Sequence, residues 1–63
     1  MSVGTNVRQY RTKQNMTQTQ LSDKTGIAQE NISGYETDTL TPSLNTLNRL
    51  ADALEVNVWQ LLK

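Results

Sequence analysis

The stretch from Met16 to Glu36, MTQTQLSDKTGIAQENISGYE, predicts two short helices joined by a tight turn. Thr17 is a favourable helix N-cap, and Gln20 three residues later completes a T-x-x-Q capping box. Gly26 tolerates the left-handed backbone conformation in which many helices end, so the first helix should end just before it. The second helix should then occupy residues 29–36, and the rest of the chain is organised around this pair.

Each helix of the pair also carries a hydrophobic staple. Met16 precedes the first cap and Leu21 lies just inside the helix, while Ile27 and Ile32 repeat the arrangement in the second helix. Helices this short are marginally stable alone and depend on tertiary packing. We therefore expect the inward positions of the pair to be Leu21, Ile27, Ile32 and Tyr35.

Helical periodicity also precedes the pair. Residues 2–14 predict a helix that Ser2 caps, although Gly4 lowers the helix propensity of its first turn. Apolar residues recur at the spacing of one helical face. This face consists of Val3, Val7 and Tyr10.

After the pair, residues 37–41 form a polar loop without an apolar period. If the backbone there needs a positive φ, Asp38 tolerates it better than most residues but less well than glycine. Pro42 blocks helix formation and Ser43 caps the next helix, which should span residues 44–55. The apolar stripe of that helix is Leu44, Leu47, Leu50, Ala51 and Leu54.

The chain ends in a short helix that Asn57 caps, with Gln60 completing a second capping box. Trp59 in this helix has two interpretations. An exposed tryptophan at this edge suggests an interface, where tryptophan is enriched, whereas a tryptophan folded back onto the preceding helix would only extend the core. We take Trp59 and Leu62 as candidate residues of a dimer interface.

The composition limits the chemistry of the chain. Sixty-three residues allow one domain with one small core. The absence of Cys and His removes disulfides, thiolate metal sites and the commonest general base, so we expect no metal, no cofactor and no enzyme activity. No apolar run is long enough to span a membrane and no signal-peptide pattern is present, which favours a cytoplasmic protein.

The charge pattern is divided along the chain. The formal net charge is zero, which is unusual for a nucleic-acid binder. Residues 1–26 carry a net charge of +3 and residues 27–63 a net charge of −3. A local positive patch is therefore possible in the first part of the chain.

In their order and spacing, these segments resemble the phage repressor and Cro family of helix-turn-helix proteins, also called the xenobiotic-response-element type. The matching pieces are MTQTQLSDKTGI-x-QENISGYE, the preceding Val7-Arg8-Gln9-Tyr10-Arg11, and the later Thr41-Pro42-Ser43-Leu44, Val56-Asn57-Val58 and Leu61-Leu62. The resemblance implies an all-α, five-helix, lambda-repressor-like DNA-binding domain over residues 1–63. The central helix-turn-helix motif would lie at about residues 17–36.

The resemblance further implies that the second motif helix enters the DNA major groove, where its N-terminal residues reach base edges. A Gln or Asn amide matches the adjacent N6 and N7 of adenine, and a Glu carboxylate can accept from cytosine N4. The candidate base contacts are Gln29, Glu30, Asn31, Ser33 and Gly34. Three of them have alternatives, because Glu30 can complement the helix dipole, Asn31 can cap the helix, and Gly34 can be needed only for its small size.

In the family, the N-terminal end of the first motif helix points at a phosphate, although a simple exposed cap is the alternative. Free backbone N–H groups and the positive end of the dipole attract an anion there. Arg11 and Glu36 resemble a structural ion pair of the family, for which a planar guanidinium is well suited. The candidate phosphate contacts are Thr17, Gln18, Arg11, Thr39, Thr41 and Ser43.

We therefore expect a transcriptional regulator that binds double-stranded DNA, represses as a homodimer at a palindromic operator, and takes no small-molecule ligand. The alternative is a protein-interaction module of the same fold, antirepressor- or antitoxin-like, with weak or no DNA binding. The zero net charge, Glu30 and Asp38 favour the alternative. Gln29 and the open polar end of the first motif helix favour DNA binding.

Overall fold

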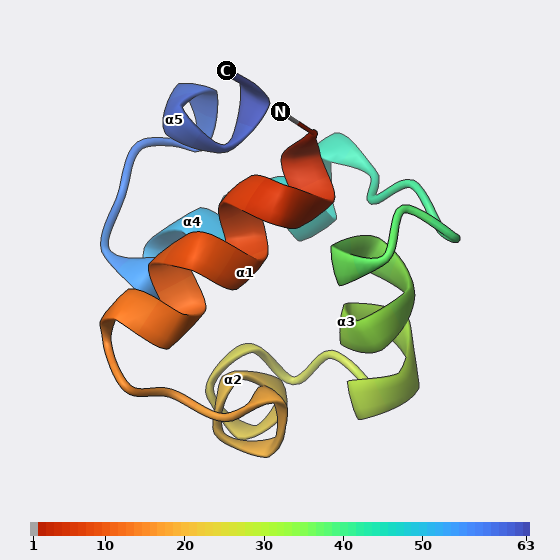
Figure 1. Ribbon diagram of the computed structural model, residues 1–63, viewed down its shortest axis with the longest axis vertical. Helices are drawn as coiled ribbons and strands as arrows, with labels where there is room; N and C mark the ends of the chain where they lie inside the picture. The colour runs from red at the N-terminus through yellow and green to blue at the C-terminus, as the bar shows by residue number, and fades with distance from the viewer. Residues whose placement is uncertain (1) are drawn as a thin grey trace.

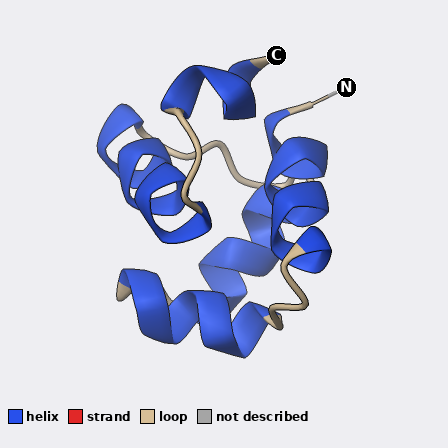
Figure 2. Ribbon diagram, turned by 90° about the vertical axis from the view of Figure 1, so that its left-hand side faces the viewer, coloured by secondary structure: helices blue, strands red, loops and turns tan. Residues whose placement is uncertain are grey.

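Five helices and their connecting loops make up the computed structural model, which describes residues 2–63 and contains no strand in that range (Figure 2). The predicted all-α, five-helix fold is confirmed, with nearly the predicted helix ends. The helices are α1 (Val3–Lys13), α2 (Gln18–Thr25), α3 (Gln29–Glu36), α4 (Leu44–Leu54) and α5 (Val58–Leu62). α1 packs on α3, α4 and α5, and α2 packs on α3 and α4 (Figure 1).

The helix ends are fixed by the local signals that the sequence carries. Oγ1 of Thr17 accepts the N–H of Gln20, and the backbone N–H of Thr17 donates to Oε1 of Gln20 at 2.8 Å, so the capping box at α2 is complete. Gly26 ends α2 at φ 74°. Ser2 and Ser43 cap α1 and α4 through their side chains. These short-range bonds fix the ends of α1, α2 and α4.

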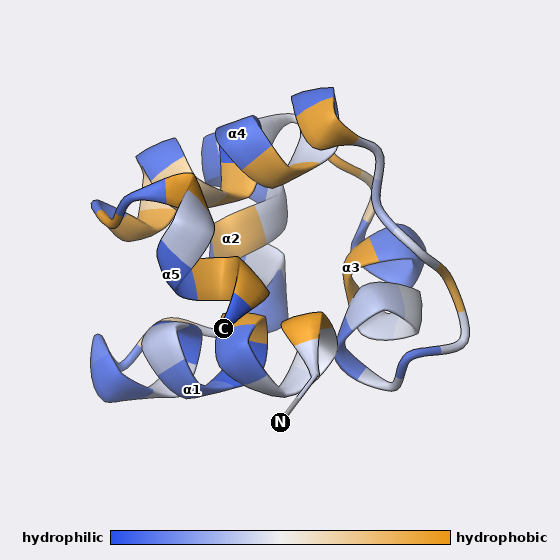
Figure 3. Ribbon diagram, turned by 90° about the horizontal axis from the view of Figure 1, so that it is seen from above, coloured by the Kyte–Doolittle hydropathy of each residue, from blue (hydrophilic) through white to orange (hydrophobic). Residues whose placement is uncertain are grey.

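The core lies between the helices, each of which carries both apolar and hydrophilic segments (Figure 3). Leu21, Ile27 and Ile32 are buried as predicted, whereas Tyr35 is only half-buried. The largest fully buried side chains are Leu21, Ile32, Leu50, Leu54, Leu61 and Val7. Leu44, the first residue of the predicted apolar stripe, lies outside this core, because its side chain is 64% exposed. As the first residue of α4, it extends the apolar stripe beyond the helices that cover the rest.

The end of α5 is held by a buried side chain that sequence analysis did not identify. Asn6 of α1 donates from Nδ2 to the carbonyl oxygens of Leu61 and Lys63, at 3.0 and 3.1 Å. These carbonyls at a helix C-terminus have no partner within the helix. Trp59, also in α5, is 55% exposed, so the interpretation of Trp59 as additional core is wrong. Nζ of Lys63 lies 5.0 Å from the centre of its ring.

Candidate functional site

One shallow polar depression lies where the N-terminus of α2 meets the outer face of α3. It is lined by Gln18 from α2 and by Gln29, Glu30 and Ser33 from α3. Gln29 and Glu30 are exposed, and Ser33 is half-buried. The structure therefore brings predicted residues from both motif helices onto one surface.

Two further residues predicted as base contacts lie outside this depression. Asn31 is exposed on α3 but does not line it. Gly34 faces Leu40 of the following loop, and a Cβ placed on Gly34 would lie 2.6 Å from Cδ1 of Leu40. This geometry favours the alternative interpretation of Gly34, in which a small residue is required for packing.

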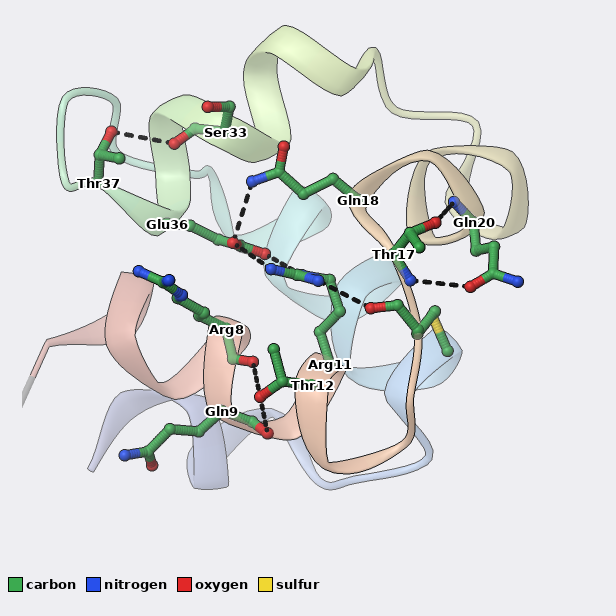
Figure 4. A network of polar contacts seen from close by, with 11 residues as sticks. Arg8, Gln9, Arg11, Thr12, Thr17, Gln18, Gln20, Ser33, Glu36 and Thr37 are labelled. Atoms are coloured by element: carbon green, nitrogen blue, oxygen red, sulfur yellow. Dashed lines mark hydrogen bonds and ion pairs between the residues drawn. The ribbon is translucent and has the colours of Figure 1, made fainter.

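A polar network below the depression joins α1, α2 and α3 (Figure 4). Nε of Arg11 donates to Oε2 of Glu36 at 2.6 Å, and Nη2 donates to Oε1 at 2.9 Å, so the predicted ion pair is formed with two hydrogen bonds. Nη1 of Arg11 donates to the carbonyl oxygen of Met16 at 2.7 Å. Nε2 of Gln18 donates to Oε1 of Glu36 at 3.1 Å. A single carboxylate thus anchors side chains from both preceding helices.

The network lies largely out of solvent. The side chain of Glu36 is 3% exposed and that of Arg11 is 12% exposed. The pKa of Arg11 is raised above its usual value, because the hydrogen bonds to Glu36 outweigh the opposing effect of burial, and the attraction between the charges adds to them. The two hydrogen bonds between Arg11 and Glu36 fix the C-terminal end of α3 against α1.

Gly4 permits the close approach of α1 to α3, a role that sequence analysis missed. A Cβ placed on Gly4 would lie 2.1 Å from the carbonyl oxygen of Tyr35 and 2.7 Å from Oδ1 of Asp38. Asp38 adopts the left-handed conformation at φ 60° and accepts a hydrogen bond of 2.8 Å from the Ser2 hydroxyl. The N-terminus of α1 favours such a carboxylate. Asp38 is thus explained by the fold and no longer favours an interaction module.

Several other polar residues are already bonded within the protein. The Ser43 hydroxyl accepts from the N–H of Thr46 and donates to its Oγ1 at 3.1 Å, so the structure gives Ser43 a capping role. Thr39 is exposed and shares a hydrogen bond of 2.9 Å with the Thr37 hydroxyl. Nζ of Lys24 donates to the carbonyl oxygen of Ala53 at 3.1 Å, near the C-terminal end of α4.

Between residues 2 and 63, no three acidic, histidine or cysteine side chains gather in a group that could hold a metal ion. Over the same range, no helix is both long and apolar enough to cross a bilayer.

The fold and the paired motif helices define a helix-turn-helix domain, and three comparisons agree. The family model described as helix-turn-helix matches residues 7–58. The immunity repressor protein of Bacillus phage phi105 is 34% identical over 58 residues, which cover 92% of this chain and 40% of that protein. The crystal structure of the restriction-modification controller protein C.AhdI from Aeromonas hydrophila superposes with a TM-score of 0.92 at 27% identity, over 95% of this chain and 91% of that one.

The chain belongs to the helix-turn-helix family of the phage repressor and Cro type, a family of DNA-binding regulators. It spans about 40% of the length of the phage repressor that it matches. The sequence-based assignment to this family is confirmed.

Proposed function

We propose that the domain binds double-stranded DNA at a specific sequence, with α3 in the major groove, and that it represses transcription. The exposed polar face of α3, continuous with the N-terminus of α2, is the observation that carries the proposal. In this docking mode the N-terminal residues of the second motif helix read base edges. Gln29, Glu30 and Ser33 occupy the first turns of α3. The similarity to a phage repressor and a controller protein supports a regulatory role.

The N-terminus of α2 supplies phosphate contacts in this proposal. The capping box bonds the N–H groups of Thr17 and Gln20, which leaves those of Gln18 and Thr19 without partners inside the helix. Such groups, together with the helix dipole, attract an anion. Arg11 has five N–H donors, of which three bond inside the protein, so two can meet a phosphate. The exposed loop hydroxyls of Thr39 and Thr41 extend these contacts.

A homodimer completes the proposal. Repressors of this type place two recognition helices on half-sites about one helical turn apart, on a palindromic operator. Trp59 and Leu62 present large apolar side chains on α5, with exposed fractions of 55% and 53%. Such side chains are enriched in interfaces. We assign the contact between the two copies to Trp59, Leu62 and the end of α4.

Selection of bound sequences from a random DNA pool tests the proposed function. We expect two related half-sites in the selected DNA. Gln29→Ala should weaken binding to that DNA by about 1–3 kcal/mol and relax one base position, because an amide matched to a base edge is lost. Gln9→Ala, an exposed glutamine of α1, is the matched control. If Gln29→Ala keeps both affinity and preference, Gln29 does not read a base.

A protein-interaction module remains the second candidate, since Glu30 is exposed on the outer face of α3 and the net charge is zero. Both features weaken attraction to a phosphate backbone. Gel retardation with a mixture of operator-like duplexes separates the two candidates. A retained complex supports the DNA-binding regulator, and its absence at every duplex concentration supports the module.

A further inference from the structure

Gln29 contacts a side chain of α2 that sequence analysis did not single out. Thr19, the second residue of α2, donates a hydrogen bond from Oγ1 to Oε1 of Gln29 at 3.2 Å. Gln18, the preceding residue, is held elsewhere, because its Nε2 donates to Glu36. Thr19 is therefore the α2 side chain that bonds to the first residue of α3.

We propose that Thr19 is a positioning residue that orients the amide of Gln29 and thereby sharpens selection of adenine over guanine. The inference rests on the proposed function, since it specifies how the same surface reads one base. This positioning role differs from a direct contact between Thr19 and a phosphate, because a phosphate contact would raise the affinity for every DNA sequence equally.

The chemistry of the amide explains the preference. The Thr19 hydroxyl occupies one of the two lone pairs of Oε1 of Gln29 and leaves the other available. Because Nε2 and Oε1 diverge from the same carbon, Nε2 points away from the Thr19 hydroxyl. In the major groove adenine offers the N6 donor beside the N7 acceptor, which Oε1 and Nε2 match. Guanine offers the acceptors O6 and N7, so the same orientation places Oε1 against O6.

A rotated amide could still bond to the Thr19 hydroxyl, which would then accept from Nε2, but only one N–H group would be left for the two guanine acceptors. Gln29 is exposed, and the terminal torsion of a glutamine side chain is broad and roughly two-fold. Without the Thr19 hydroxyl, a rotated amide can direct both N–H groups of Nε2 at the guanine acceptors. Loss of one neutral hydrogen bond shifts such an equilibrium roughly two- to tenfold. We therefore expect a loss of base discrimination of that size.

The experiment compares Thr19→Val, which keeps the shape and removes the hydroxyl, with Thr19→Ser, which keeps the hydroxyl. The first probe is the duplex that the wild-type protein selects from a random pool. The second duplex carries G·C in place of A·T at the base pair whose readout Gln29→Ala relaxes. The measured quantity is the ratio of two dissociation constants, that for the G·C duplex divided by that for the selected duplex. Thr19→Val should lower this ratio roughly two- to tenfold, whereas Thr19→Ser should keep it.

Two controls isolate the effect. Thr19 is exposed, so both variants should melt close to the wild type. In a Gln29→Ala background, Thr19→Val should leave the ratio unchanged, since the amide that it positions is absent. A change of the ratio in that background overturns the inference.

The remaining outcomes separate this inference from the proposed function. If Thr19→Val keeps the wild-type ratio, the inference is overturned while the proposed function stands. An equal loss of affinity for both duplexes overturns it too, because Thr19 then acts on a phosphate. A wild-type protein that shows no base preference at any position overturns the proposed function and this inference together.

Discussion

α3 and α4 are held in the bundle by different forces. α4 buries five residues, all of them apolar, whereas α3 buries only Ile32 and Glu36. Apolar burial is non-directional and acts along α4 from Leu47 to Leu54. The bidentate bond between Arg11 and Glu36 acts at one end of α3 and fixes its orientation. This difference shows how α3 is held firmly while its N-terminal residues Gln29, Glu30 and Asn31 stay exposed.

The largest expected effect concerns the ion pair. Glu36→Ala should lower the free energy of unfolding by about 3–5 kcal/mol, because Arg11 is left buried without its partner. Urea denaturation followed by circular dichroism measures the change. Glu30→Ala, an exposed carboxylate of the same helix, should change stability by no more than about 0.5 kcal/mol. A Glu36→Ala protein with a wild-type midpoint would show that α3 is held by apolar contacts, as α4 is.

Leucine-to-alanine substitutions in α4 test whether apolar burial holds this helix in the bundle. Leu50→Ala should lower the free energy of unfolding by about 2–5 kcal/mol, since it opens a cavity at a fully buried position. Leu44→Ala removes the same atoms from a side chain that is 64% exposed and should change stability by about 0.5 kcal/mol or less. Equal losses in the two variants would place Leu44 in a packed environment and contradict the structure. The stabilities of the two variants are compared by thermal melting at the same protein concentration.

Two glycine substitutions test how closely α3 packs against α1 and against the loop that follows α3. Gly4→Ala should destabilise the domain by about 1–3 kcal/mol, because the new methyl group meets the backbone carbonyl of Tyr35 and forces α1 from α3. Gly34→Ala should cost less. Its methyl group meets the side chain of Leu40, which is 44% exposed and can move into solvent. Hydrogen exchange of the α3 amides measures the destabilisation in both variants. A larger loss of protection in Gly34→Ala than in Gly4→Ala would contradict the packing described for the two glycines.

The fold could be predicted because its helix ends depend on residues close together in sequence. The capping box at Thr17 and the left-handed Gly26 are local signals, and both lie where the sequence places them. Resemblance to a family supplied the pairing of Arg11 with Glu36, since no local pattern joins residues that far apart. The exposed Leu44 shows the limit of hydrophobic periodicity. Periodicity predicts which residues share one face of a helix, but not how far the neighbouring helices cover that face.

The roles of Gly4 and Thr19 could not be predicted because they depend on which helices pack against each other. Gly4 matters because the backbone after Tyr35 passes over it, and Thr19 because the turn brings Gln29 beside it. Neither partner is close in sequence. Asn6 did leave a signal, because it lies three residues after Val3 on the apolar face of α1, where a polar residue requires a buried partner. The sequence-based identification of the candidate DNA surface therefore lacked Gly4 and Thr19, which contact α3 directly.

The internal bonds of Arg11 and Lys24 have a consequence for the response of binding to ionic strength. Arg11 donates to Glu36 and Met16, and Lys24 to Ala53, so two of the four basic residues in the first part of the chain are engaged inside the protein. Each neutralised phosphate of B-DNA contributes about −0.9 to the slope of log K against log salt. With about two phosphates neutralised per copy, a dimer should show a slope of about −4. Operator binding would then persist in moderately concentrated salt, while binding to unrelated DNA would stay weak. A slope of about −8 or steeper, measured by titration across a salt series, would mean that more cations neutralise phosphates than these internal bonds allow.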